Sequence, residues 1–457
     1  MNTPLWTSSE IEQATGGCAN DHFEVTGVTF DSREVRAGDL FIGMPGTVYD
    51  GHRFVASAFE SGAAGAIVSH AVEGPHVLVE DVPAALEGLA KASRARSTAT
   101  IIGVTGSVGK TSTKEALFAA LERSRRGKVH RSVKSYNNHT GVPLSLARMP
   151  RDADFAVLEL GMNHAGEIAA LTRLLRPHVA LITAIAPAHI ENLGSEESIA
   201  DAKAEIFEGL NGDGVAIIPN DSPHRDRLLN AARRHADRIV TFGQGDADVH
   251  ALHAVAEGGG SLLTAALLDC ELTFTISQRG EHWVSNALAV LAAVEAVGGD
   301  VALAGLALAD FGGLKGRGQR HRVSIGDGTF LLIDESYNAN PASMAATLKS
   351  LGAELDAERR IAVLGPMREL GDHSDVMHAG LAPAISDARV DRLILIGQEM
   401  APLADALRDE MAVERADNVE EATQALLHAV RPGDAVLVKA SNSVGLARLV
   451  ERVAGGG

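Results

Sequence analysis

The stretch TIIGVTGSVGKTSTKE, residues 100–115, determines how the rest of the chain is organised. Residues 101–105 form a β-branched apolar run that is typical of a buried strand, and residues 111–121 have the spacing and composition of a helix. A glycine turn between a strand and a helix can place backbone N–H groups around phosphates. The stretch therefore predicts a site for a nucleoside triphosphate.

The turn itself, residues 105–111 with the sequence TGSVGKT, supplies two side chains suited to this role. Lys110 offers a point charge to the phosphates, and the hydroxyl of Thr111 is a potential magnesium ligand. Val104 stands where the general phosphate-loop pattern has its first glycine. The alternative is a glycine turn with an exposed lysine, but the flanking strand and helix favour phosphate binding. The loop alone does not specify the enzyme.

Composition limits the possible functions. A chain of 457 residues is expected to form two or three domains. Its formal charge of -18 disfavours nucleic acid as a partner. Cys18 and Cys270 have no metal-ligand spacing, which excludes a disulfide scaffold and fits a reducing compartment. Residues 1–10 lack the order of a signal peptide, and the longest apolar runs are too short to cross a bilayer, so we expect a cytoplasmic protein without membrane insertion.

Residues 1–97 are predicted to form a first unit. Its expected strands cover residues 23–30, 40–44, 66–68 and 77–79, and its expected helices cover residues 8–14, 53–61 and 82–95. Ser32 and Arg33 lie in a loop between two of these strands and could hold a phosphate, although a solvated turn is favoured when the loop is taken alone. His52 has the same ambiguity.

From residue 98 onwards, predicted strands and helices alternate, which indicates a mostly parallel sheet with helices on both faces. Ligands in such sheets bind beyond the carboxyl ends of the strands. Asn137 and Asn138 follow the predicted strand 128–133, where turn formation is the alternative. Glu159 lies within the predicted strand 155–160, and a buried carboxylate is costly unless it is paired or metal-bound. With a phosphate loop upstream, magnesium is the favoured explanation.

Three further polar residues are less decisive. His189 ends the predicted strand 179–190, where it could be a ligand or only a hydrogen-bonded polar residue. Lys203 lies on a helix that begins near residue 195, and periodicity does not distinguish it from a solvated lysine. Asn286 opens the predicted helix 287–297 and could contact a base or cap the helix.

The glycine-rich segment 312–319, GGLKGRGQ, predicts a boundary and a hinge. A third alternating unit follows, with strands expected at residues 329–333, 361–364, 393–396 and 435–438. Two polar segments, 334–340 and 439–445, come directly after predicted strands and so belong to the expected ligand edge.

In this order the motifs resemble those of the Mur ligase family, the ATP-dependent amide-forming enzymes of peptidoglycan precursor synthesis. The motifs that carry the resemblance span nearly the whole chain: TGSVGKTSTKE, NNHTGVPLSL, ELGMNHAGEI, AHIENLGS, DAKAEIF, DESYNANPASM, GPMRELGDHS and KASNSVGLARLV. Several are weak individually, but their combination and order are highly specific.

The resemblance implies an α/β chain of three domains: residues 1–97 for a UDP-linked substrate, residues 98–314 for a central P-loop ATPase sheet, and residues 315–457 for a Rossmann-like ligase domain. It implies that ATP phosphorylates UDP-MurNAc-tripeptide to an acyl phosphate, which the amine of D-alanyl-D-alanine attacks. Alternatives are a sibling ligase that adds the third peptide residue, a folylpolyglutamate synthase-like ligase, and a P-loop switch protein that ligates nothing. A monomer is expected.

The resemblance also assigns roles to residues. Two Mg²⁺ ions are expected, one on Thr111 and Glu159 and the other on His189 and a carbamylated Lys203. Catalytic roles fall to Lys110, Asn138, His189 and Lys203, and Asn286 would contact adenine. The expected ATP site comprises Thr105, Gly106, Ser107, Val108, Gly109, Lys110, Thr111, Ser112, Asn286, Arg317, Asp334 and Tyr337. The expected substrate site comprises Ser32, Arg33, His52 and Asn338.

The chain departs from the family at one position that bears on the ATP site. The usual Pro-Gly-Arg is replaced by Lys315-Gly316-Arg317, and Arg320 follows closely. The sequence alone does not distinguish which of the two arginines faces ATP.

Overall fold

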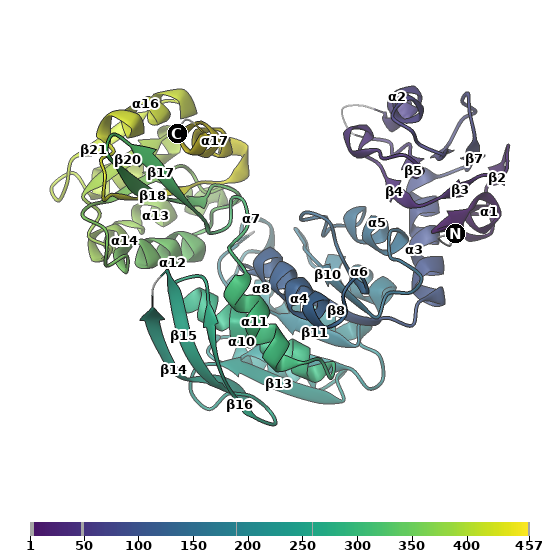
Figure 1. The fold of residues 1–457 in the computed structure, drawn as a ribbon, viewed down its shortest axis with the longest axis horizontal. Coiled ribbons are helices and arrows are strands. Elements are labelled where there is room, and N and C mark those ends of the chain that lie inside the picture. The colour runs from purple at the N-terminus through teal and green to yellow at the C-terminus, as the bar shows by residue number, and fades with distance from the viewer. Residues whose placement is uncertain (1–3, 47–49, 189, 258, 456–457) are drawn as a thin grey trace.

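The computed structural model describes residues 4–46, 50–188, 190–257 and 259–455. The chain forms three α/β units, and the N-terminal and C-terminal units lie at opposite ends of the central one (Figure 1). No helix in the described part of the chain is both long enough and apolar enough to cross a membrane.

The N-terminal unit contains a five-stranded sheet in the order β2-β7-β6-β5-β4 and a two-stranded sheet of β1 and β3. Its strands are β1 Trp6–Thr7, β2 Cys18–Ala19, β3 Glu24–Val25, β4 Gly27–Thr29, β5 Asp39–Ile42, β6 Gly65–Val68 and β7 His76–Leu78. Its helices are α1 Ser8–Thr15, α2 Val55–Glu60 and α3 Val82–Arg96. The helix predictions are confirmed, but the prediction of one strand over 23–30 is wrong. The N–H of Thr26 turns away to the Gly38 carbonyl, which divides the run between two sheets.

The central unit is built on a nine-stranded sheet in the order β16-β15-β14-β13-β12-β11-β8-β10-β9. Along the sheet from β9 to β14 all neighbouring strands are parallel, which confirms the prediction of a mostly parallel sheet. The pairs β14–β15 and β15–β16 are antiparallel. The strands are β8 Thr100–Thr105, β9 Val129–Arg131, β10 Phe155–Glu159, β11 Val179–Ile182, β12 Val215–Pro219, β13 Arg238–Gly243, β14 Val249–Glu257, β15 Gly260–Ala266 and β16 Glu271–Ile276.

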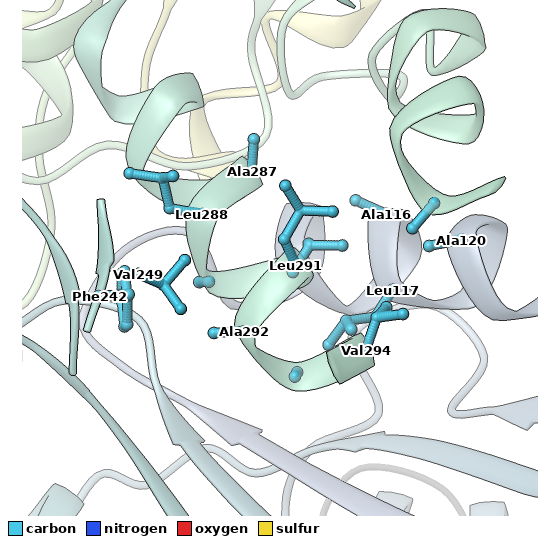
Figure 2. Packing of buried hydrophobic residues seen from close by; sticks show 14 of the residues in the cluster. Ala116, Leu117, Ala120, Phe242, Val249, Ala287, Leu288, Leu291, Ala292 and Val294 are labelled. Carbon is cyan, nitrogen blue, oxygen red and sulfur yellow. The ribbon is translucent and has the colours of Figure 1, made fainter. Parts of the chain in front are cut away.

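Helices cover both faces of this sheet because alternate strand residues are apolar on each side. On one face, α4 Lys110–Ser124, α10 Glu281–Ala296 and α11 Val301–Asp310 share a hydrophobic cluster with the strands. Figure 2 shows Leu117 of α4 beside Val294 of α10 in this cluster. A second cluster covers the other face, where the helices are α5 Gly141–Ala147, α6 Glu167–Leu175, α7 Ile190–Leu193, α8 Glu196–Ala204 and α9 Arg225–Ala232.

Three sequence predictions for the central unit are wrong in extent. The strand expected over 128–133 is β9, which covers only residues 129–131. The apolar run 179–190 is a strand only over β11, because pairing with β12 ends at Leu181 and pairing with β8 ends at Ile182. Helix α10 begins at Glu281 rather than near residue 287. Asn286 therefore lies inside the helix and does not cap it.

The C-terminal unit has a six-stranded sheet in the order β17-β18-β22-β19-β20-β21, parallel except for β17. Its strands are β17 Gln319–Ile325, β18 Gly328–Glu335, β19 Arg360–Leu364, β20 Arg392–Ile396, β21 Val413–Ala416 and β22 Ala435–Lys439. Its helices are α12 Pro341–Gly352, α13 Ser374–Ala379, α14 Ala382–Asp387, α15 Ala401–Ala406, α16 Val419–Ala429 and α17 Ala447–Gly455. β18 is longer than predicted, so Asp334 lies within the strand rather than after it.

Candidate active site between the central and C-terminal units

A cleft of about 630 Å³ lies between the central and C-terminal units. Its central side comes from segments that follow β8, β10 and β11, together with the first turns of α10. Its C-terminal side comes from segments that follow β18, β19 and β22. The carboxyl ends of two parallel sheets therefore face one cleft, where ligands of such sheets bind.

The phosphate loop forms one wall of the cleft, from Ser107 to Ser112. Lys110 Nζ donates to the Gly106 carbonyl at 2.6 Å, which aims the ammonium along the loop. Burial lowers the pKa of Lys110, while the nearby Glu159 carboxylate acts in the opposite direction. Thr105 and Gly106, both predicted to contact ATP, lie behind the lining residues.

Thr183, which follows β11, fixes the shape of this loop. Its hydroxyl donates to the Val108 carbonyl at 2.5 Å and lies so close to Gly106 that a Cβ there would be 2.0 Å away. Gly106 also has a φ of 149°, which L side chains rarely adopt. The sequence did not single out Thr183, although its position directly after a strand is the signal that could have found it.

Thr111 and Glu159, which the family resemblance places on one metal ion, are adjacent in the cleft. The Thr111 hydroxyl donates to Glu159 Oε2 at 2.8 Å, and Asn137 Nδ2 donates to Oε1 at 2.8 Å. The Glu159 side chain is buried and is anchored by these two polar partners. The pair presents oxygen atoms of two residues beside Lys110.

Asn138 and Asn286 also line the cleft. The Asn138 side-chain oxygen accepts the N–H of Gly141 at 2.9 Å, so the residue also shapes the turn before α5. Asn286 projects from the second turn of α10 towards the phosphate loop, where its oxygen accepts the Thr113 hydroxyl at 3.4 Å. Its side chain is thus available to the cleft rather than used as a helix cap.

Lys203 is buried on α8, with only 1% of its surface exposed. Desolvation lowers the pKa of Lys203 well below its usual value, and the nearby Lys110 charge lowers it further. The Lys203 side chain is not among those that line the cleft. The interpretation as a solvated lysine is therefore excluded.

His189, the expected neighbour of Lys203, lies outside the described residues. Within the described part of the chain, no three His, Cys, Asp or Glu side chains gather into a group that could hold a metal ion. Of the four expected metal ligands, only Glu159 is a described side chain of these types, because Thr111 and Lys203 are of other types and His189 is not described.

The structure distinguishes the two arginines near residue 317. Arg317 lines the cleft, where its Nη2 donates to Ser135 Oγ of the central unit at 3.2 Å and its guanidinium lies 4.2 Å from the centre of the Tyr337 ring. Arg320 is turned away and donates two 2.8 Å hydrogen bonds to Glu354. Only Arg317 is placed to meet a ligand in the cleft.

Asp334 supports this arrangement from behind. It is 1% exposed, accepts the Gly316 N–H at 2.7 Å and accepts the Ser336 hydroxyl at 2.6 Å. It does not line the cleft, whereas Tyr337 and Asn338 do. Asp334 thus shapes the turn that presents Arg317.

The cleft contains an ion pair to which the sequence assigned no role. Lys439 Nζ lies 3.4 Å from Glu335 Oε2 and donates to the Asn338 carbonyl at 2.9 Å. Burial raises the pKa of Glu335 and lowers the pKa of Lys439. Both residues end strands at the ligand edge, which is the signal that marks them.

The predicted substrate residues of the N-terminal unit are not part of this cleft. Ser32 begins a short turn, and the adjacent Arg33 side chain is 87% exposed and pairs with Asp31. The ring of His52 is held between Asp50, 2.5 Å from Nδ1, and the N–H of Ser69, 2.8 Å from Nε2.

Comparison with known proteins finds relatives for all three units of the chain. Residues 24–96 match the model described as Mur ligase family, catalytic domain; residues 104–294 match the Mur ligase middle domain; and residues 316–442 match the Mur ligase, glutamate ligase domain. The chain is 36% identical, over 96% of both proteins, to the UDP-N-acetylmuramoyl-tripeptide--D-alanyl-D-alanine ligase of Bacillus subtilis.

Solved structures agree with these matches. The chain superposes on a crystal structure of MurF from Acinetobacter baumannii with a TM-score of 0.85 and 30% identity, over 99% of both chains. It superposes on MurF ligase from Thermotoga maritima in complex with ADP with a TM-score of 0.77 and 27% identity, over 94% of this chain and 97% of that one. With three domain matches in order and full-length relatives above 30% identity, the chain belongs to the Mur ligase family, and within it to the MurF type.

Proposed function

We propose that the protein joins D-alanyl-D-alanine to UDP-MurNAc-tripeptide, with ATP as the energy source, and so forms UDP-MurNAc-pentapeptide for peptidoglycan. The observation that carries this proposal is the cleft, where the phosphate loop of one unit faces Arg317 and Lys439 of another. The chain also resembles ligases of that name over nearly its whole length.

The three units divide the work. Residues 98–314 bind ATP, and residues 315–457 close over the nucleotide and the amine substrate. Residues 1–97 hold the uridine diphosphate end through Ser32, Arg33 and His52. The exposed Arg33 guanidinium supports this role, because its only carboxylate partner among the described residues, Asp31, is two positions away and a diphosphate can compete for it.

The first step is phosphoryl transfer. A carboxylate oxygen of the tripeptide bonds to the γ-phosphorus of ATP, the bond to the bridging oxygen breaks, and ADP leaves with the electron pair. Negative charge accumulates between the two anions, so preorganised cations lower the barrier. Lys110 lies in the phosphate loop and Arg317 faces it across the cleft, so both are placed to stabilise this charge. Asn138 contacts the transferred phosphoryl group.

The second step forms the amide. The amine nitrogen of D-alanyl-D-alanine attacks the acyl carbon, the bond from that carbon to the phosphate oxygen breaks, and phosphate leaves with the electron pair while the nitrogen loses a proton. Tyr337 and Asn338 line the C-terminal wall of the cleft. Closure of that wall excludes water, which would otherwise hydrolyse the acyl phosphate.

Thr111 and Glu159 fit a magnesium ion. They present a hydroxyl and a carboxylate oxygen 2.8 Å apart, beside the phosphate loop, and Mg²⁺ is commonly held by one or two carboxylates together with substrate phosphates. When bound, the ion supplies positive charge to the phosphate oxygens. Asn137 holds the other carboxylate oxygen and so keeps Glu159 turned towards Thr111.

For the second ion we propose Lys203, modified to a carbamate, with His189. A protonated lysine does not fit a cation site. Burial lowers the pKa of Lys203 and so favours the neutral amine, whose nitrogen can bond to the carbon of CO₂ as one proton is released. The product carries anionic oxygen, which suits Mg²⁺.

The test is phosphate release from ATP, measured with each substrate omitted in turn. Release that requires both UDP-MurNAc-tripeptide and D-alanyl-D-alanine, accompanied by the pentapeptide product in mass spectrometry, supports the proposal. Preference for diaminopimelate, lysine or glutamate as the amine would indicate a sibling ligase. Nucleotide binding without substrate-dependent release would indicate a switch protein. We place the reaction in the cytoplasm and the enzyme in a monomeric state, which light scattering after size-exclusion chromatography can check.

A further inference from the structure

A second lysine follows the phosphate loop, and the mechanism above does not use it. Lys114 lies one helical turn after Lys110 on α4, and its side chain is 0% exposed. Its Nζ donates to the Ser132 carbonyl at 2.9 Å and to the Lys134 carbonyl at 2.6 Å, and it pairs with Glu115 Oε1 at 2.9 Å. Three acceptors therefore match the three N–H bonds of the ammonium.

Burying the charged ammonium of Lys114 costs free energy that an apolar side chain would not. A buried charge must be paired and hydrogen-bonded to be tolerated, and apolar side chains of similar volume often stabilise a protein at least as well. Glu115 does not depend on Lys114 alone, because its other oxygen pairs with Arg131 Nε at 2.9 Å. The specific contribution of Lys114 is therefore its hold on the two carbonyls of the segment that follows β9.

This segment, residues 132–138, needs to be held. Lys134 has a φ of 54°, and a non-glycine residue in this region costs roughly 1 kcal/mol. The carbonyl of this same residue accepts the shorter of the two Lys114 hydrogen bonds. The ammonium of Lys114 therefore binds the carbonyl of the very residue, Lys134, whose backbone is strained.

The segment carries side chains that organise the cleft. Ser132 Oγ accepts the Glu159 N–H at 3.0 Å, and Asn137 holds the Glu159 carboxylate from the other side. Ser135 Oγ lies 3.2 Å from the Thr111 hydroxyl and accepts from Arg317 at 3.2 Å. One short loop therefore contacts both residues of the proposed metal site and the arginine of the C-terminal unit.

We propose that Lys114 is a positioning residue for phosphoryl transfer. It holds residues 132–138 in their strained conformation, so that Ser135 joins Thr111 to Arg317 when the cleft is closed. This inference rests on the proposed function for its kinetic consequence, but the hold on the loop is testable without it.

The test begins with Lys114→Met, which keeps the length of the side chain and removes its donors. The matched control is Lys128→Met, just before β9, where the lysine is half-exposed and pairs only with Asp152 among the described residues. Displacing reactive groups by about 1 Å can cost a hundredfold in rate. We therefore expect kcat to fall tenfold to a hundredfold in Lys114→Met while the Kd for ATP changes less than about threefold, and we expect neither to change in Lys128→Met.

A double variant and a conservative variant distinguish a positioning role of Lys114 from a purely structural one. If Lys114 acts through the loop, Lys114→Met should cost clearly less in a Ser135→Ala background than alone, because contacting sites are not additive. Lys114→Gln, whose amide can still donate to the carbonyls, should recover part of kcat. Wild-type kcat in Lys114→Met, or strictly multiplicative losses in the double variant, would overturn the proposal.

Hydrogen exchange gives a readout that does not require turnover. Without substrates, the amides of residues 132–138 and of Glu159 should exchange faster in Lys114→Met than in the unmodified chain, with no change in the C-terminal sheet. If the unmodified chain ligates nothing, the proposed function fails, and unaltered exchange in the variant would separately refute the hold on the loop. If Lys114→Met does not fold, Lys114→Gln carries both measurements.

Discussion

Arg317 and Arg320 should respond in opposite ways to alanine substitution, although they are three residues apart. Arg320 donates two 2.8 Å hydrogen bonds to Glu354, whose side chain is 6% exposed. A hydrogen bond to a charged group contributes about 1.5–3 kcal/mol, and removing one partner of a buried pair costs about 3–5 kcal/mol. Glu354 keeps Arg279 at 3.3 Å, which reduces the loss. We therefore expect Arg320→Ala to lower the free energy of unfolding by about 2 kcal/mol.

Arg317 makes weaker contacts within the protein. Its hydrogen bond to the Ser135 hydroxyl is 3.2 Å long, and its stacking partner Tyr337 is 37% exposed. A hydrogen bond of this kind contributes about 1 kcal/mol and an exposed cation–π contact about 0.5–1 kcal/mol. These contributions add to about 1.5–2 kcal/mol, but both contacts border the open cleft, where solvent screening weakens them, so Arg317→Ala should destabilise the protein by roughly 1 kcal/mol. Turnover should nevertheless fall about a hundredfold or more, because the variant removes a cation that faces the phosphates.

The measurements are urea unfolding and phosphate release at saturating substrates, applied to both variants. The expected pattern is a stability loss with nearly intact turnover for Arg320→Ala, and the reverse for Arg317→Ala. Lysine at position 317 should restore only part of the rate, because the ammonium lacks the planar guanidinium fork. A larger loss of turnover in Arg320→Ala than in Arg317→Ala would refute the assignment of the ATP-facing arginine.

Three further predictions address other parts of the site and the fold. Lys203→Ala should be almost inactive and partly rescued by acetate. Lys203→Arg should be inactive without rescue, because its guanidinium stays charged and fills the space that acetate would occupy. Wild-type turnover of Lys203→Ala in bicarbonate-free buffer would disprove the carbamate. Glu159→Gln should fold normally, since its amide oxygen can accept from Asn137 while its NH2 donates to the Thr111 oxygen. It should nevertheless lose about a hundredfold in phosphate release. Burial lowers the pKa of His130 to about 4, so between about pH 6.5 and pH 4 this residue gains a proton only in the unfolded chain. The free energy of unfolding, measured in urea, should therefore fall as the pH is lowered through this window. His130→Gln should reduce this dependence of the unfolding free energy on pH.

The features that the sequence predicts best are those with a local cause. The phosphate loop, its flanking strand and helix, and the alternation of strands with helices all follow from short-range periodicity and turn chemistry. The resemblance to the Mur ligases implied that Thr111 and Glu159 act together, and the structure gives the physical cause of their proximity: β8 and β10 are parallel neighbours whose carboxyl ends meet at one edge.

Element boundaries were harder to predict because apolar residues outside a strand can still be buried. Ala186 and Ala188 are as buried as many strand residues, yet they lie in the loop after β11. The prediction of a strand over 179–190 is wrong because a run of apolar residues indicates that the segment is buried but does not indicate that it pairs with another strand. Helix α10 has no side-chain cap at Gly280, so no local signal marks its true start, and the apolar run after Asn286 predicts a start that is too late.

Long-range pairing was beyond the reach of the sequence. Arg320 is excluded from the cleft by Glu354, which is 34 positions away, and no local pattern connects them. Lys114 is a strong helix former in a position that resembles a solvated face, so its complete burial follows only from the path of residues 132–134 across it.

The charges of the cleft explain why a strongly acidic protein can bind anionic substrates. The described lining carries four basic side chains, Lys110, Arg317, Arg368 and Lys439, and four acidic ones, Glu159, Glu167, Glu335 and Glu369. Burial lowers the pKa of His282, the histidine of this lining, to about 4, so it adds no charge at neutral pH. These side chains are balanced before ATP and a carboxylate enter, and protein cations alone cannot neutralise both ligands. We propose that the remaining positive charge arrives with the nucleotide as metal ions, and that Glu159, beside the phosphate loop, would give one of those ions a fixed place.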